Sequence, residues 1–319
     1  MTKPPSTSTT AARLHEHGQA LRVEQVPLAE PGAGEVLVRL AFAGVNPVER
    51  YAALGRVAAD VPLPRTLGNE GAGTLDGARV AVAGGGIGSQ RDGAWAGAVV
   101  APRQAVIAVP DGLGLREAAC CGVAGLTAWS TVVERARVTD ADTVLVLGAG
   151  GGVGLPIVSL AHGLGARVVG QIGTAAKAEA VRAAGADDVV TVDAEGLAAA
   201  VGSLTPTVVV DPLGGGLAPA AIGLLAAHGR YVVYGTSAGA EVTLDWQQVY
   251  RRGLTVLGYS GMVLADDERA RLLPLVLDAL ATGAMRMPID TVLPLAEVED
   301  ALQRLAGRGV TGKLVLDVG

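Results

Sequence analysis

The first third of the chain alternates short apolar runs with turn residues. The apolar runs lie at residues 36–40, 79–82, 98–100 and 105–109. Proline and glycine interrupt the chain between and beside them, as at 31–34 and 110–112, and such segments favour turns over continuous helices. This pattern predicts an antiparallel β domain in the first part of the chain.

From about residue 142 the pattern changes to buried-type strands that alternate with helices. Five runs rich in Val, Ile and Leu have the length of strands, and they lie at 143–147, 167–172, 188–192, 207–210 and 230–234. An alanine-rich segment of helical character follows each of the first four. Such an alternation is typical of a parallel sheet with helices on both faces. We therefore predict a doubly wound α/β domain.

The tail of the chain resembles the first part in its mixture of strands and helices. After an apolar strand at 254–259 we expect a helix at 266–280, a strand at 289–293, a shorter helix at 295–305 and a last strand at 313–318. We expect this tail to rejoin the first domain. The predicted domains are residues 1–121 together with 261–319, and residues 122–260, which suits a chain of 319 residues.

Charge and composition exclude several classes of protein. The chain has 25 Lys and Arg against 31 Asp and Glu, and its arginines are scattered, so a basic surface for nucleic acid is not expected. Its first ten residues are polar, and it has no apolar stretch long enough to span a membrane. Cys120 and Cys121 are adjacent, which suits a reducing compartment. We expect a cytoplasmic protein that binds neither nucleic acid nor membranes.

A glycine-rich turn joins the strand at 143–147 to an apolar helical segment at 155–161. From Gly148 to Gly154 it reads Gly-Ala-Gly-Gly-Gly-Val-Gly. This arrangement suits a pyrophosphate, because N–H groups at a helix N-terminus face the anion and glycines let the backbone approach it closely. A second glycine string at 84–88 leads into polar residues, and we interpret it as a loop. The turn at 148–154 therefore predicts dinucleotide binding.

The segment after the second strand indicates which dinucleotide is bound. An acidic residue at this place would recognise the ribose 2′-hydroxyl of NAD, but residues 168–177 contain no carboxylate. Thr174 and Lys177 offer a hydroxyl and an ammonium that suit a 2′-phosphate, so we predict NADPH. The alternative is that Thr174 caps the next helix and Lys177 is only solvated.

Five motifs together resemble a known family. They lie at 44–51, 67–73, 124–129, 148–154 and 170–177. In this order they resemble the medium-chain dehydrogenase/reductases, specifically the zinc-independent quinone oxidoreductase branch that includes zeta-crystallin. The resemblance implies a GroES-like β domain, built from both chain ends, and a Rossmann domain, with the active site in the cleft between them.

The same resemblance allows a test for zinc. It places Asn46, Asn69 and Val123 where zinc-dependent relatives have their three catalytic zinc ligands, and none of these is a good zinc ligand. The segment 82–95 is also too short for the family's structural zinc lobe. We therefore expect no metal site.

The resemblance further assigns residues to the cofactor. It implies that Ala149, Gly151, Gly152 and Gly154 belong to the phosphate turn, and that Val153 packs behind the nicotinamide ring.

Other residues receive a role from more distant segments. The resemblance implies that Thr127 lies near the nicotinamide, that the loop from Gly235 to Ser237 lies under the cofactor, and that Lys313 reaches the pyrophosphate.

The candidate catalytic residues, Asn46 and Tyr51, resemble substrate-side residues of the quinone oxidoreductases. Asn46 has a second interpretation from the residues alone, because Asn before Pro47 is also a common helix N-cap with proline in the first turn.

The expected reaction follows from the absence of zinc. Hydride transfer puts negative charge on an acceptor oxygen, and quinones or α,β-unsaturated carbonyls delocalise that charge themselves. We predict an NADPH-dependent reductase of such small molecules, with Tyr51 or water as proton source.

Two other functions stay open. An enoyl-thioester reductase is one, since residues 46–47 and 68–71 also resemble that branch, although Val57 stands where a tyrosine is typical there. The other is a non-catalytic NADPH-binding protein with a structural or sensor role. In either case the apolar strand at 254–258 predicts a homodimer, because it joins two sheets in this family.

Overall fold

The computed structural model describes residues 8–319 and divides into two compact units. Unit 1 holds the chain up to Ala124 together with Leu264–Thr282 and Ile289–Gly319. Unit 2 holds Gly125–Val263 together with Gly283–Pro288. Most of the polar N-terminal segment, and the first seven residues of the predicted first domain, lie outside the described residues.

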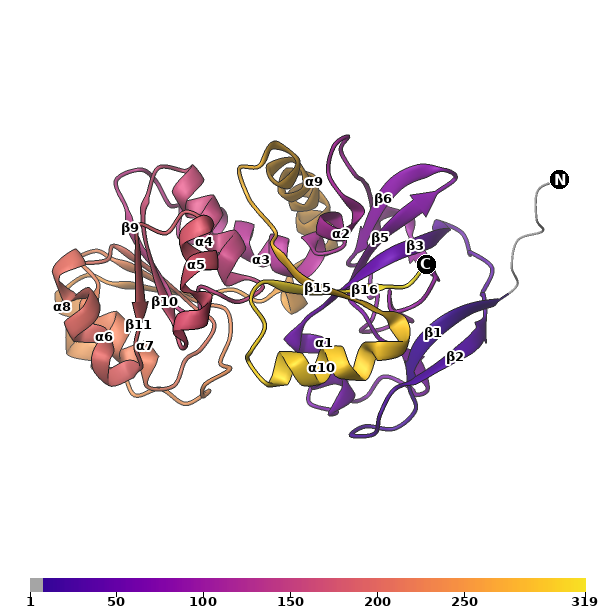
Figure 1. Cartoon of the computed structure of the whole chain (residues 1–319), viewed down its shortest axis with the longest axis horizontal. Coiled ribbons are helices and arrows are strands. Elements are labelled where there is room, and N and C mark those ends of the chain that lie inside the picture. Colours follow the sequence, from indigo (N-terminus) through magenta and orange to yellow (C-terminus); the bar gives the residue numbers. More distant parts are fainter. Residues whose placement is uncertain (1–7) are drawn as a thin grey trace. The chain divides into compact units, whose positions relative to one another are not determined.

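A seven-stranded sheet forms the centre of unit 1 (Figure 1). Its strands are β3 (Glu35–Val45), β5 (Glu70–Leu75), β6 (Ala78–Ala83), β7 (Ala98–Pro102), β8 (Val106–Ala108), β15 (Ile289–Pro294) and β16 (Lys313–Asp317). The order is β15-β16-β3-β5-β6-β8, with β7 paired to β3, and all pairs except β15 with β16 are antiparallel. The tail of the chain therefore enters the sheet beside β3.

A smaller antiparallel sheet accompanies it. Its strands are β1 (Ser8–Leu14), β2 (Arg22–Pro27) and β4 (Arg65–Thr66), with β1 in the middle. The apolar pattern did not predict β1 and β2, because β2 is largely exposed and polar, and β1 buries mainly two alanines and a leucine.

Trp95 lies fully buried in the core of unit 1. Its indole N–H donates to the carbonyl of Gly44 at 3.0 Å, so the one polar atom of the ring is paired. The helices of this unit are α1 (Pro47–Ala53), α2 (Leu115–Ala118), α9 (Asp266–Thr282) and α10 (Val298–Ala306). On α10 the buried residues Val298, Ala301 and Leu302 recur at the three- and four-residue spacing of one helix face.

Unit 2 contains a six-stranded parallel sheet with the order β11-β10-β9-β12-β13-β14. These strands are β9 (Thr143–Val146), β10 (Arg167–Ile172), β11 (Asp188–Thr191), β12 (Val208–Asp211), β13 (Arg230–Val233) and β14 (Thr255–Gly258). The helices are α3 (Leu126–Trp129), α4 (Gly154–Gly163), α5 (Ala178–Ala183), α6 (Ala194–Val201), α7 (Leu217–Leu224) and α8 (Trp246–Arg251).

Helices cover both faces of this parallel sheet (Figure 1). Val169 of β10 belongs to the cluster that packs against α6 and α7. The next residue, Gly170, points to the opposite face, where a Cβ atom would lie 2.5 Å from Val181 of α5. Both faces are therefore buried, which explains why the strands are apolar throughout.

The predicted combination of an antiparallel β domain and a doubly wound α/β domain is confirmed. The units differ from the predicted division by three residues at each of two boundaries, 122–124 and 261–263, and by one further segment. Gly283–Pro288 groups with unit 2 and not with the first domain. The physical reason is local, since Arg286 N–H donates to Ser159 Oγ at 2.9 Å and the guanidinium of Arg286 donates to the carbonyl of Ala183 at 3.3 Å.

Candidate functional site

The glycine turn after β9 has an inner set of hydrogen bonds. Gly148 N–H donates to the side-chain oxygen of Gln171 at 3.1 Å. Ala149 N–H donates to the main-chain carbonyl of Gln171 at 2.9 Å, and Gly151 N–H returns to the carbonyl of Gly148 at 3.0 Å. These amides are used within the protein, so Ala149 and Gly151 contribute to the shape of the turn.

Three other amides of the turn have no partner among residues 8–319. They are the N–H groups of Gly150, Gly152 and Val153, which precede the first helical turn of α4. Unpaired N–H groups at the positive end of a helix are suited to an anion. The turn therefore fits a phosphate group of a dinucleotide.

Close contacts explain two glycines of the turn. A Cβ atom on Gly154 would lie 2.5 Å from the carbonyl oxygen of Gly148. A Cβ atom on Gly150 would lie 2.8 Å from Cδ of Lys177, so the aliphatic part of this lysine packs directly on the turn. Lys177 is therefore part of the surroundings of the turn, where it lies half-buried.

Thr174 is exposed beside this lysine. It occupies the N-cap position of the short 3-10 helix Ala175–Lys177, but its side chain makes no capping hydrogen bond. Thr174 therefore stands at the N-cap position, as the helix-cap interpretation expects, but its hydroxyl does not cap the helix.

The loop after β13 is held to the loop after β12. The amide and the hydroxyl of Ser237 both donate to the carbonyl of Pro212, at 3.1 and 3.2 Å. A Cβ atom on Gly235 would lie 2.7 Å from the same oxygen, and one on Gly148 would lie 3.3 Å from Cγ of Pro212. Pro212 thus brings Gly235 and Ser237 to the carboxyl edge of the sheet where the glycine turn lies.

A buried carboxylate fixes the loop after β12. Asp211 is fully buried and accepts N–H donors from Leu213 at 2.5 Å and from Gly214 at 3.1 Å. The Tyr231 hydroxyl donates to its other oxygen. Burial, together with the charge of Asp211, raises the pKa of Tyr231, so this phenol stays a donor. Sequence reasoning missed Asp211. The available signal was that an acidic residue ends a strand of otherwise apolar residues.

Thr127 lies on α3, which packs against α4. Its carbonyl accepts a hydrogen bond from the Thr131 hydroxyl at 2.8 Å. The structure therefore places Thr127 in the same unit as the glycine turn, and its role near the nicotinamide stays a prediction.

Four side chains form a buried polar cluster in unit 1. Asn46, Glu49, Glu70 and Lys313 are all at most 3% exposed. The Lys313 ammonium donates to Asn46 Oδ1 at 2.5 Å and to the carbonyl of Val45 at 3.0 Å. It also lies 3.3 Å from Glu70 Oε1, which accepts from Asn46 Nδ2 at 2.9 Å.

This cluster corrects the predicted role of Lys313. Its ammonium donates to three oxygens within unit 1 and is buried, so it is not offered to a pyrophosphate. Burial lowers the pKa of Lys313, but the negative charges of Glu70 and Glu49 and the hydrogen bond to Glu70 act in the opposite direction, and the pKa stands above its ordinary value. Lys313 is the internal cation of the cluster.

Asn46 is the N-cap residue of α1, which begins at Pro47 as the sequence predicts. Its backbone N–H donates to Glu49 Oε2 at 2.8 Å, while both ends of its side-chain amide bond to cluster residues. Tyr51 lies half-buried on α1, and its substrate-side role stays a prediction.

The three positions that the family resemblance matches to zinc ligands are each hydrogen-bonded to Glu49, to Glu70 or to both. Asn69 N–H donates to Glu49 Oε1 at 3.0 Å, and Val123 N–H donates to Glu70 Oε2 at 2.7 Å. Asn46 reaches both carboxylates. The carboxylates of Glu49 and Glu70 therefore link these three positions through hydrogen bonds.

Two further observations concern metals and membranes. Among residues 8–319, no three His, Cys, Asp or Glu side chains gather in a way that could hold a metal ion. The described helices also include none that is both long and apolar enough to cross a bilayer.

Cys120 and Cys121 are free and buried. Burial raises the pKa of Cys120 to about 12 and that of Cys121 well above its ordinary value, so both thiols stay protonated and unreactive.

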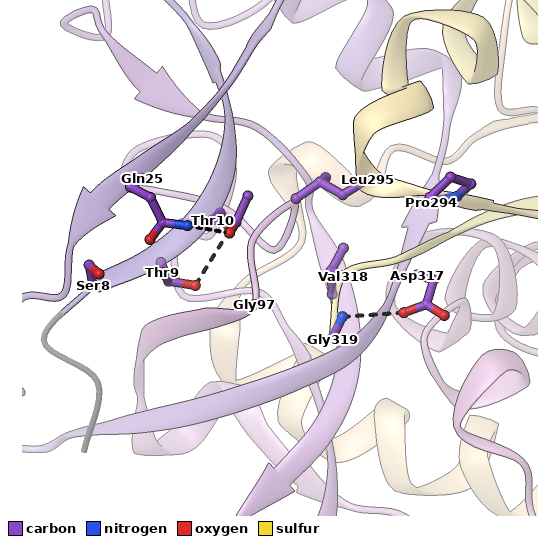
Figure 2. A pocket seen from close by; sticks show the side chains of 10 residues that line it. All are labelled: Ser8, Thr9, Thr10, Gln25, Gly97, Pro294, Leu295, Asp317, Val318 and Gly319. Atoms are coloured by element: carbon purple, nitrogen blue, oxygen red, sulfur yellow. Dashed lines mark hydrogen bonds between the residues drawn. The ribbon is translucent and has the colours of Figure 1, made fainter. Parts of the chain in front are cut away.

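A separate hollow of about 530 Å³ opens on unit 1 (Figure 2). It is lined by Ser8, Thr9, Thr10, Gln25, Gly97, Pro294, Leu295, Asp317, Val318 and Gly319. Its polar groups bond to each other, as Gln25 Nε2 does to Thr10 Oγ1 at 2.6 Å. None of the predicted site residues lines it.

The buried cluster predicts a pH-dependent stability. Burial and the charge of Glu70 raise the pKa of Glu49 from 4.5 to about 7, although Lys313 opposes the shift. A raised pKa means that the contribution of Glu49 to stability is complete below pH 4.5 and is lost as the pH rises towards 7. Wild type should therefore lose about 2 to 3 kcal/mol relative to Glu49→Gln between pH 5 and pH 8.

Chemical denaturation of both proteins across this range measures the difference. Glu16→Gln removes an exposed carboxylate of the same unit and should follow wild type. Parallel curves for wild type and Glu49→Gln would show that Glu49 titrates at an ordinary pKa.

Comparisons with known proteins agree with this arrangement. A family model described as zinc-binding dehydrogenase matches residues 152–278. A zinc-type alcohol dehydrogenase-like protein of Schizosaccharomyces pombe is 30% identical over 79% of this chain and 78% of its own length. A quinone oxidoreductase of Pseudomonas aeruginosa is 28% identical over 90% of this chain and 92% of its own length.

A solved structure extends the likeness to three dimensions. The quinone oxidoreductase of Thermus thermophilus, known with and without NADPH, matches 97% of this chain and 99% of its own chain at 28% identity and a TM-score of 0.84.

Other relatives are much longer. A mycocerosic acid synthase-like polyketide synthase of Mycolicibacterium smegmatis is 28% identical over 90% of this chain, but the match spans only 14% of that protein. Full-length matches to single enzymes, the two-unit fold and the glycine turn all lead to one conclusion. The chain belongs to the medium-chain dehydrogenase/reductase family of oxidoreductases, among its quinone oxidoreductase-like members.

Proposed function

We propose that this chain is an NADPH-dependent oxidoreductase that works without zinc and reduces a quinone or an α,β-unsaturated carbonyl compound. The carrying observation is the glycine turn, which has unpartnered amides at Gly150, Gly152 and Val153 and against which Lys177 packs at Gly150. The Thermus relative, whose structure is known with NADPH, supports the choice of cofactor. When bound, NADPH supplies the hydride.

In this proposal, the residues at the carboxyl edge of the parallel sheet each contribute to binding NADPH. The three free amides hold the pyrophosphate, and Gly154 lets α4 begin close to it. Lys177 and Thr174 meet the 2′-phosphate, where no carboxylate of β10 would repel it.

Other residues complete the cofactor site. Gly235 and Ser237 lie at the same edge and support the cofactor from below. Val153 and Thr127 contact the nicotinamide in this proposal.

The proposal of zinc independence rests on side-chain chemistry. Val123 offers no ligand atom, and the Asn46 amide is already bonded to Lys313 and Glu70. Without a Lewis acid, the acceptor must carry the developing negative charge itself, as quinones and conjugated carbonyls do. Tyr51, on α1, or water supplies the proton.

A second candidate is reduction of an enoyl thioester. The specific observation in its favour is the polyketide synthase relative, which matches nearly the whole of this chain. The acceptor separates the two candidates, because both use the same cofactor site.

We further propose that the protein is a cytoplasmic homodimer. Two free, buried cysteines agree with a reducing compartment. Strand β14 is an edge of the parallel sheet and exposes Val256, and such an edge pairs readily with another strand.

NADPH oxidation with a panel of acceptors tests the function. We expect turnover with quinones or conjugated enones, slower turnover with enoyl thioesters, and less than one zinc ion per chain by elemental analysis. Faster turnover of enoyl thioesters would favour the second candidate. Tight NADPH binding without turnover of any acceptor would indicate a structural or sensor protein, and one tightly held zinc per chain would overturn the metal-free reaction.

Lys177→Ala tests the choice of cofactor. Loss of a charge-assisted contact should weaken NADPH binding about ten- to a hundredfold and leave NADH nearly unchanged. Arg182→Ala removes an exposed cation from α5, the helix that directly follows Lys177, and should change neither affinity. Calorimetric titration of both nucleotides at one salt concentration measures the effect. Equal small losses for both nucleotides would show that Lys177 is only solvated.

Sedimentation of wild type and Val256→Glu tests the dimer. Wild type should sediment as a dimer at micromolar concentration, and the variant should shift towards monomer because a carboxylate at an edge strand opposes pairing. Leu164→Glu, at a partly exposed apolar position after α4, should remain dimeric. A stable wild-type monomer would contradict the proposal.

A further inference from the structure

Gln171 connects three neighbouring strand ends in unit 2. It lies in β10, between β9 and β11, and is 2% exposed. Its side-chain oxygen accepts the N–H of Gly148 at 3.1 Å, and its side-chain nitrogen donates to the carbonyl of Val192 at 2.7 Å. Its own carbonyl accepts the N–H of Ala149 at 2.9 Å. The amide side chain is therefore fully oriented by the protein.

The glycine turn cannot supply the partner that Gly148 needs. Gly148 has a φ of +61°, so the chain leaves the extended conformation at this residue. Its neighbour Leu147 still pairs with Val210 across the sheet, and Gly148 N–H then turns to Gln171. Gly148 is half-buried, and without Gln171 its N–H would have no partner among residues 8–319, so this bond favours the observed turn over other conformations of the glycines.

The direction of the remaining amides depends on that first bond. With Gly148 and Ala149 both bonded to Gln171, the chain is fixed on entry to the turn, and Gly151 closes it on the carbonyl of Gly148. The amides of Gly150, Gly152 and Val153 are then left without partners among residues 8–319. Five glycines would otherwise give this segment wide conformational freedom.

We propose that Gln171 is a positioning residue for the pyrophosphate, which it does not itself contact. It holds the glycine turn in the binding conformation before the nucleotide arrives. This inference rests on the proposed nucleotide-binding function. It differs from the role given to Lys177, because the pyrophosphate is common to NADPH and NADH whereas the 2′-phosphate is not.

Gln171→Met tests the inference, because methionine keeps the length and volume of the side chain but removes both hydrogen bonds. We expect the dissociation constants of NADPH and NADH to rise by the same factor, about tenfold. Gln247→Met makes the same chemical change at an exposed position on α8 and should leave both constants unchanged. Titrations are made well below the melting temperature of each protein.

A purely structural role gives a different result. Gln171→Met would then melt at a lower temperature, while its folded form would bind both nucleotides as wild type does, and this outcome overturns the inference. A loss confined to NADPH would overturn it as well, because that loss belongs to the 2′-phosphate.

Amide hydrogen exchange of the wild-type protein, followed by NMR, provides a measurement that needs no variant. Without nucleotide, the Gly148 amide should exchange slowly and those of Gly150 and Gly152 rapidly. Added NADPH should then protect Gly150 and Gly152. Rapid exchange at Gly148 in the free protein would overturn the inference even if the variant fails to fold. Failure of wild type to bind any dinucleotide would instead refute the proposed function. The exchange rate of the Gly148 amide in the free protein could still be measured in that case.

Discussion

A single buried ammonium group joins parts of unit 1 that lie far apart in the sequence. Lys313 begins β16, while its partners end β3, begin α1 and begin β5. Two carboxylates of the cluster, Glu49 and Glu70, would be costly to bury without a nearby positive charge. The position of α1, which carries Tyr51, and the hydrogen bonds to Asn69 and Val123 all depend on this one charge.

The features that the sequence predicts well are those with local causes. The parallel sheet followed from apolar strands that alternate with helices, because burial on both faces leaves no polar alternation. The start of α1 followed from Asn46 and Pro47, since capping involves adjacent residues. The glycine turn was recognisable because a Cβ atom on Gly154 would meet a backbone oxygen of the same turn. The need for glycine at this position therefore arises within a segment of seven residues.

The features that sequence reasoning missed depend on contacts across the fold. The family resemblance assigns Lys313 to the pyrophosphate, and the sequence around this lysine gives no sign that Glu70, far away in the chain, will neutralise it. Gln171 and Asp211 looked like ordinary strand residues, and their importance comes from amides of neighbouring strand ends. β1 and β2 were missed because half-exposed strands with charged residues lack an apolar run. In each case the fold decides which residue becomes the partner, and the local sequence pattern carries no information about that partner.

The place of β16 within its sheet also has a consequence for biosynthesis. This strand lies between β15 and β3, so the seven-stranded sheet cannot be completed until β16 itself has left the ribosome. Nearly all of unit 2 is made before that moment and can fold while the chain is still growing. During this interval β3 has a free edge and the carboxylates of Glu49 and Glu70 lack their cation. Until β16 is made, the nascent chain is therefore open to aggregation through the free edge of β3.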